Sequence, residues 1–195
     1  MEERNAAVRQ IRSLPQRYTL REDDKNAYIE GYFSVFNTPY VLWEGAEEII
    51  LPGAFDGCMG QDTRALVNHD TTLVLGRTKN GTLELKQDDH GLWGRITINK
   101  ADTDAMNLYA RVARGDVDQC SFGFTIESER YVDLGGGKCR WEIEKIGQLF
   151  EVSVCTFPAY EATSVSAREA DLKEINRRKL ESRRAEIMKK LKGEI

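Results

Sequence analysis

Histidine, cysteine and long apolar runs are all scarce in this sequence. Its 195 residues include two histidines and four cysteines. No apolar run approaches the roughly 18 residues that a membrane span needs. The first 20 residues also lack the apolar stretch of a secretory signal. We therefore expect a protein without membrane contact that stays in the cytoplasm of the cell that makes it.

The cysteines are Cys58, Cys120, Cys139 and Cys155. Their wide spacing, without a CxxC pair, predicts free thiols in a cytoplasmic chain. Only His69 and His90 could join them as zinc ligands, so we expect no metal site. The glycines at 135–137 lack the Lys-Ser/Thr of a phosphate-binding loop, and no cofactor is expected.

Charge is distributed unevenly along the chain. Residues 167–195 carry a net charge of +4, so the remainder carries −8 of the total of −4. An acidic body argues against nucleic acid as the main partner. The basic segment either docks on an acidic partner or is a solvated charged helix, and the pattern favours the solvated helix.

The pattern divides the chain into three parts. Residues 1–24 are polar and weakly patterned, which predicts an N-terminal arm. Residues 25–165 are mostly strand-like, with hairpin turns expected at 88–91 and 135–137. Residues 166–195 predict a charged helical tail that begins at a capping box formed by Ser166 and Glu169.

One helix is expected inside the strand-rich part. Asp102 or Thr103 can cap it, Gly115 can end it, and apolar residues recur on one face between them. The sequence thus predicts an α+β protein in which strands dominate.

His69 is the stronger of the two candidates for a catalytic base. His90 lies in the expected turn at 88–91, which is typical of an exposed residue. His69 ends an alternating stretch, on the face that Ala65 and Val67 share. A histidine there is either a hydrogen-bonded core residue or a site residue, and the pattern alone does not choose.

Ser121 is the candidate nucleophile. Alternation over 120–126 places Cys120 on an apolar face with two phenylalanines and places Ser121 on the opposite face, next to Gly123. Cys120 is the rival nucleophile, but its position favours a small core residue. Taken alone, Ser121 also fits an ordinary small residue on a sheet.

Several blocks of this sequence, in order, resemble those of the prohead (head-maturation) proteases of tailed bacteriophages. The blocks are GYFSVFN (31–37), EEIILPGAF (47–55), RALVNHD (64–70), LGRTKNGTLEL (75–85), DDHGLW (88–93), RGDVDQCSFGF (114–124) and LFEVSVCTFPAY (149–160). The resemblance implies an antiparallel β-barrel with surrounding helices, similar to the herpesvirus proteases. It also implies that His69 is the base and Ser121 the nucleophile.

The resemblance further implies a serine endopeptidase that cleaves the major capsid protein, scaffold protein and itself inside the assembling procapsid. Self-association is an additional expectation. The alternative is a non-enzymatic scaffold component that uses the same barrel as an interaction module. Such a component would be expected to lose His69 or Ser121, and this chain has both.

The group that orients His69 is the least determined part of the site. Glu151 interrupts the apolar run 149–157, where an unpaired carboxylate would be costly, so we expect Glu151 to pair with His69. The alternative is an edge-strand glutamate that faces water. Asp70, Asp88 and Asp89 are the other acidic candidates, the first on the wrong strand face and the others in a turn. Arg77 and Arg114 are candidates to assist backbone N–H groups at the oxyanion.

Overall fold

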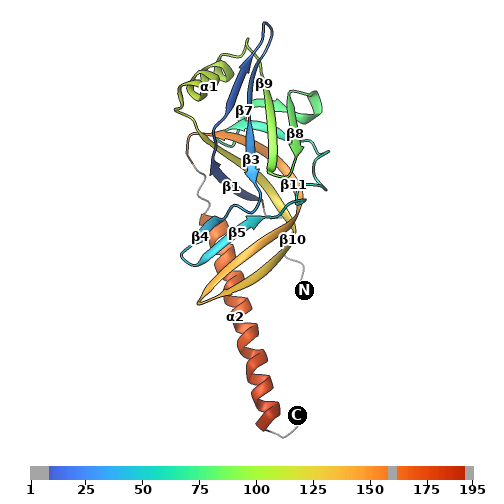
Figure 1. Ribbon diagram of the computed structural model, residues 1–195, viewed down its shortest axis with the longest axis vertical. Coiled ribbons are helices and arrows are strands. Elements are labelled where there is room, and N and C mark those ends of the chain that lie inside the picture. The colour runs from blue at the N-terminus through green and yellow to red at the C-terminus, as the bar shows by residue number, and fades with distance from the viewer. Residues whose placement is uncertain (1–8, 158–161, 192–195) are drawn as a thin grey trace. The chain divides into compact units, whose positions relative to one another are not determined.

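The structure is a computed structural model that describes residues 9–157 and 162–191 (Figure 1). The chain divides into two units, residues 1–159 and residues 160–195. The first is a strand-rich body. The second contains α2 (Ala162–Leu191). Within the described ranges, no helix has the length and apolar character to cross a membrane.

Two sheets build the body. The strands are β1 (Gln10–Pro15), β2 (Thr19–Glu22), β3 (Ala27–Val35), β4 (Tyr40–Trp43), β5 (Ala46–Ile50), β6 (Arg64–Val67), β7 (Asp70–Arg77), β8 (Leu83–Gln87), β9 (Gly91–Ile98), β10 (Gln119–Gly135) and β11 (Lys138–Cys155). The larger sheet has seven strands in the order β1-β10-β11-β5-β4, with β6 paired to β11 and β7 paired to β6. The smaller sheet has the order β2-β3-β9-β8.

These sheets do not close into the barrel that we expected. Most strand pairs are antiparallel, but β11 runs parallel to β5 with its first half and parallel to β6 with its second half. Such long-range parallel pairs carry no local sequence pattern. The described part of the body has one α-helix, α1 (Thr103–Arg114), and a single 3₁₀ turn, η1 (Thr78–Asn80), so the ring of helices is also absent there.

The core lies against one face of β10. Cys120, Phe122 and Phe124 are fully or almost fully buried on this face, and the two phenylalanine rings stack with centroids 4.8 Å apart. Burying an aromatic side chain of this size stabilises the fold by about 1.5–3 kcal/mol. The expected alternation of 120–126 is therefore confirmed for the core face.

The expected turns and helix limits of the body are confirmed. The Asp102 carboxylate accepts hydrogen bonds from the N–H groups of residues 104 and 105, and Gly115 ends α1 with φ 84°. The hairpin of β8 and β9 turns at 88–90, and the hairpin of β10 and β11 turns at three glycines with positive φ. Glycine adopts this conformation without steric cost.

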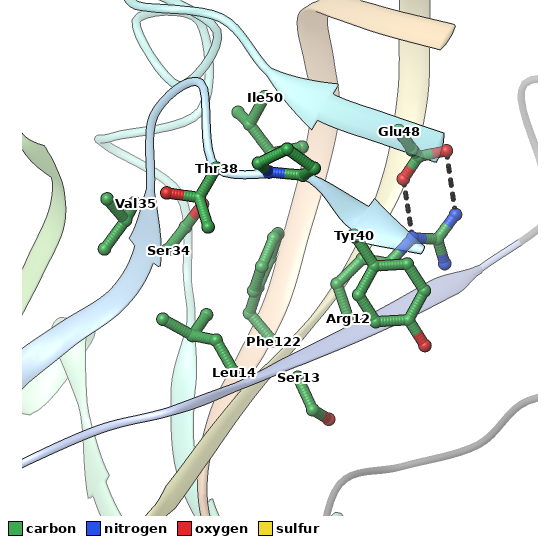
Figure 2. Close-up of a pocket in the computed structure, with 11 residues that line it drawn as sticks. Arg12, Ser13, Leu14, Ser34, Val35, Thr38, Tyr40, Glu48, Ile50 and Phe122 are labelled. Atoms are coloured by element: carbon green, nitrogen blue, oxygen red, sulfur yellow. Dashed lines mark hydrogen bonds and ion pairs between the residues drawn. The ribbon is translucent and has the colours of Figure 1, made fainter. Parts of the chain in front are cut away.

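Part of the segment that we expected to be a polar arm forms strands. Residues 10–15 pair with β10, and residues 19–22 pair with β3. Arg12 is buried, yet its guanidinium donates to both carboxylate oxygens of Glu48 at 2.5 and 2.9 Å (Figure 2). A paired polar residue can therefore occupy a buried position of a strand, which the polar pattern of residues 1–24 concealed.

The C-terminal helix differs from expectation at its start. It begins at Ala162, so the capping box expected at Ser166 and Glu169 lies within the helix rather than at its end. The side chains of both residues lie outside the described part of the chain.

Candidate active site

The candidate site lies on the face of β10 and β11 that is opposite to Phe122. Ser121 is directly across from Ser153, and Gly123 is across from Glu151. Directly opposed residues of an antiparallel pair project from the same face, with Cβ atoms about 4.5–5.5 Å apart. The sheet thus gathers two serines and a carboxylate on one surface.

His69 reaches this surface from a tight turn. Val67 pairs with Asp70, which leaves Asn68 and His69 as a two-residue hairpin loop. Both have positive φ, 49° and 63°, as in a type I′ turn. This placement corrects the expectation that His69 continues the face of Ala65 and Val67, because the strand ends at Val67.

The turn is fastened by hydrogen bonds to β11 and to Thr156, which follows it. The Asn68 N–H donates to the Val154 carbonyl at 3.1 Å, and the Thr156 N–H donates to the Asn68 side-chain oxygen at 2.9 Å. The His69 N–H donates to the Ser153 hydroxyl at 3.2 Å. These bonds hold a non-glycine residue in a backbone conformation that costs on the order of 1 kcal/mol.

His69 and Glu151 are in direct contact, as the sequence predicted. The Nδ1 atom of His69 lies 2.8 Å from Glu151 Oε1. An ionised carboxylate only accepts hydrogen bonds, so the neutral tautomer that donates from Nδ1 to Glu151 carries its free lone pair on Nε2. The arrangement is that of an imidazole prepared to accept a proton.

The buried Glu151 carboxylate has three partners. Besides His69, Arg9 Nη2 lies 2.8 Å from Oε1, and the Ser153 hydroxyl donates to Oε2 at 2.6 Å. Gly123 leaves the necessary space, since a Cβ there would lie 2.6 Å from Glu151 Oε1 and 2.9 Å from the Arg9 guanidinium. The edge-strand alternative for Glu151 is therefore wrong, because this side chain is only 3% exposed.

The other acidic candidates are engaged elsewhere. Asp70 accepts hydrogen bonds from the backbone and hydroxyl of Thr72, which lower the pKa of its carboxyl group. Asp88 accepts from the Tyr32 hydroxyl and from two backbone N–H groups of its own turn. Asp89 is exposed in that turn.

Ser121 lies on the correct face but is not hydrogen-bonded to His69. Its hydroxyl donates to the Arg12 carbonyl of β1 at 2.9 Å, and the side chain is buried. Its neighbour across the strands, Ser153, has its hydroxyl 3.5 Å from His69 Nδ1. The described geometry thus places Ser121 on the same face as Ser153 and Glu151, without the nucleophile–base bond that the sequence suggested.

The cysteines near the site are poor nucleophiles in this arrangement. Burial raises the pKa of Cys120 far above its ordinary value, and its thiol points to main-chain carbonyls of the core. Cys155 Sγ lies 3.9 Å from His69 Nε2. Burial, followed by the charge of Glu151, raises the pKa of Cys155 to about 12. Both sulfurs are therefore neutral thiols at neutral pH.

The remaining candidates lie outside the site. Arg77 forms an ion pair with Asp62, and Arg114 forms one with Asp116. His90 packs edge-on against Tyr32 with ring centroids 4.5 Å apart. The described residues contain no cluster of three or more His, Cys, Asp or Glu placed to hold a metal.

A pocket between β1, β3 and β4 has none of Ser121, His69 and Glu151 in its lining. It is lined by Arg12, Tyr40 and Phe122, among others (Figure 2). Phe122 projects from the opposite face of β10 to Ser121. The pocket therefore does not open onto the Ser121 hydroxyl.

Three contacts of the site were not expected from the sequence: those of Arg9, Ser153 and Cys155. Ser153 and Cys155 alternate with Glu151 along β11, so the two-residue period of a strand could have identified both. Arg9 lies in the segment expected to be an arm, and no local pattern connects it with Glu151.

A serine and a glutamate on one buried sheet face, with a histidine that contacts the glutamate from an adjacent turn, are the residue types of a serine hydrolase. Comparison with known proteins identifies the family. The family model described as Caudovirus prohead serine protease matches residues 16–178, and the chain belongs to this family. The resemblance seen in the sequence is thus confirmed.

The chain is similar to one known protein in sequence and to another in fold. It is 34% identical over 149 residues to the prohead protease of Enterobacteria phage HK97, an alignment that covers 74% of this chain and 61% of that protein. The chain therefore spans about three-fifths of the length of this relative. The capsid assembly protease of bacteriophage T4 has a similar fold, with a TM-score of 0.50 and 12% identity over 75% of this chain and 96% of that one.

Proposed function

We propose that this protein is a serine endopeptidase that cleaves capsid and scaffold proteins, and itself, during phage head maturation. Membership of the prohead serine protease family supports this activity, and the names of the HK97 and T4 relatives support the setting. The enzyme would act in the host cytoplasm, inside the assembling procapsid. A closer relationship to the herpesvirus proteases stays a prediction.

The observation that carries the proposal is the 2.8 Å contact between His69 and Glu151 on the face that holds Ser121. In the proposed reaction, the Ser121 hydroxyl exchanges the Arg12 carbonyl for His69 Nε2 as its acceptor. Nε2 takes the proton while Ser121 Oγ attacks the peptide carbonyl carbon. Glu151 stabilises the imidazolium that forms.

The second half of the reaction returns the enzyme to its starting state. The imidazolium gives its proton to the leaving amine, and the peptide C–N bond breaks to leave an acyl-enzyme on Ser121. His69 then takes a proton from water, whose oxygen attacks the ester carbonyl carbon. The ester C–O bond breaks, the imidazolium returns its proton to Ser121 Oγ, and the carboxylic acid product leaves. No cofactor is needed for these steps.

Co-expression with the major capsid protein from the same genome tests the function. The wild-type chain should shorten the capsid protein, and Ser121→Ala should not. Cys120→Ala is the matched control, because it alters the adjacent residue on the core face and should keep most activity. An unshortened capsid protein with the wild-type chain would contradict the proposed function.

The non-enzymatic scaffold alternative receives less support. Neither His69 nor Ser121 has been lost, and His69 retains a carboxylate partner in a buried setting. Burial of such a charged group is costly when it serves packing alone.

For the C-terminal helix we propose a role in docking within the procapsid, or removal by self-cleavage, rather than in chemistry. Some of its charges pair within the helix, as Glu174 does with Arg177 and Arg178. Leu180 and Ile187 are about half exposed. A chain that ends at Ser166 should cleave a soluble peptide substrate as the full chain does, and a folded but inactive product would contradict this role.

A further inference from the structure

Ser153 contacts both the proposed base, His69, and the carboxylate that orients it, Glu151. Its hydroxyl donates to Glu151 Oε2 at 2.6 Å and accepts from the His69 main-chain N–H at 3.2 Å. Among the described residues, no other side chain combines contacts to Glu151 and to the backbone of His69. Ser153 therefore links β11 to the turn at Asn68–His69, two segments that are far apart in the sequence.

The hydroxyl hydrogen of Ser153 has a defined direction. A serine has one O–H donor, and the short bond to Glu151 Oε2 uses it. In its 3.5 Å contact with His69 Nδ1, the Ser153 oxygen can therefore only accept a hydrogen bond. Ser153 is thus neither poised to attack nor available to donate to the base.

We propose that Ser153 is a positioning residue for the proteolytic reaction. It fixes the Glu151 carboxylate so that Oε1 faces His69 Nδ1, and it fixes the backbone of the turn so that the imidazole presents Nδ1 to Glu151. This inference rests on the proposed function, because positioning matters only if His69 acts as a base. Ser153 would act through Glu151 and His69 without contacting substrate.

Two expected kinetic effects of removing the Ser153 hydroxyl distinguish a positioning role from a role in packing alone. Losing a hydrogen bond to a charged group should lower kcat roughly 10- to 100-fold, while KM changes little because substrate contacts are unaffected. The loss should also depend on Glu151. Once Glu151 is replaced by glutamine, the further effect of removing the Ser153 hydroxyl should shrink to about threefold or less.

The experiment is a double-mutant cycle of Ser153→Ala and Glu151→Gln in the full chain. The substrate is a peptide that spans the cleavage site found by N-terminal sequencing of the processed capsid protein. Ser34→Ala is the matched control, since Ser34 is a buried serine of β3, in the other sheet. It should leave kcat within about twofold of wild type, as expected for a site away from the chemistry.

The outcomes are distinct. An inactive wild-type chain would remove the proposed function itself. An active wild type with an equally active, folded Ser153→Ala variant would overturn the positioning role, as would a full additive loss in the Glu151→Gln background. If Ser153→Ala does not fold, Ser153→Cys, which has a similar volume and a weaker donor, should show an intermediate kcat with unchanged KM. Wild-type kcat in folded Ser153→Cys would also overturn the proposal.

Discussion

Around Ser121 and Glu151, the two faces of the β10–β11 hairpin are both buried but are stabilised in opposite ways. On one face, Phe122, Phe124 and Val152 exclude water through apolar packing. On the other, Ser121, Ser153 and Glu151 are also almost inaccessible, and each has a hydrogen-bond partner. One pair of strands thus carries a core surface and a polar site surface.

This difference predicts different responses to mutation. Apolar contacts add up over area and tolerate replacements of similar volume. Buried polar groups depend on specific partners, and an isolated buried charge is costly. Changes on the core face should therefore lower stability, whereas conservative changes on the site face should lower activity in a protein that still folds.

Ser121→Ala should give the largest effect on activity. Loss of the nucleophile is expected to lower kcat roughly 10⁵- to 10⁶-fold, while the fold loses only one hydrogen bond to the Arg12 carbonyl. Cys120→Ala, one residue along on the core face, should keep most activity and lose some stability. Peptide cleavage measures the activity of each variant, and thermal unfolding measures its stability. A folded, inactive Cys120→Ala beside an active Ser121→Ala would reverse the assignment.

Glu151→Gln should follow in magnitude. The amide keeps the shape but cannot stabilise the imidazolium, so we expect a fall in kcat of about 10⁴-fold. Asp70→Asn is the control, since Asp70 bonds to Thr72 and not to His69. Single-turnover cleavage compares the two variants. Turnover near wild type in folded Glu151→Gln would remove Glu151 from the site.

Phe122→Ala should show the response of the core face. We expect a loss of about 3–5 kcal/mol in the free energy of unfolding, since a fully buried ring leaves a cavity. Activity per folded molecule should change far less than in Glu151→Gln. Urea unfolding measures the free energy of unfolding. Peptide cleavage at low temperature, where the variant is folded, measures the activity per folded molecule. A stable Phe122→Ala with no activity would mean that the two faces are not separate in function.

The smallest expected effect is a pH dependence of stability that is caused by Cys155, which lies on the site face. Its folded pKa is raised to about 12, against about 8.5 for an unfolded thiol. Above the unfolded value, the unfolded chain releases a proton that the folded chain retains. The stability from this group is thus fully present below about pH 8.5 and is lost as pH rises toward 12.

Urea unfolding at pH 8 and pH 10 tests this dependence. The free energy of unfolding should fall over this range in the wild type, and it should fall less in Cys155→Ala. Equal slopes for the two proteins would show that the thiol is not buried as described.

The sequence predicts local features of this molecule well. The caps of α1, the hairpin turns and the alternation of β10 depend on neighbouring residues and were all expected. Glu151 was singled out because a carboxylate in an apolar run needs a partner. The structure supplies that partner in His69.

The pairing of strands that are far apart in the chain could not be predicted from the sequence. The parallel alignment of β11 with β6, which sets Ser153 beside Leu66 and fastens the His69 turn, joins segments far apart in the chain. The turn itself was missed because Asn-His-Asp is a weak signal compared with Asn-Gly. The pairing of β1 with β10 was missed because a buried Arg12–Glu48 pair looks polar in sequence.

Covalent labelling of the nucleophile tests the account most directly. The full chain is incubated with a fluorophosphonate, which reacts with activated serine hydroxyls, and the adduct is located by peptide mass spectrometry. We predict one adduct on Ser121 that is absent in Ser121→Ala and strongly slowed in His69→Ala and Glu151→Gln. An adduct on Ser153, or labelling of Ser121 at an unchanged rate without His69, would contradict the assignment of Ser121, His69 and Glu151.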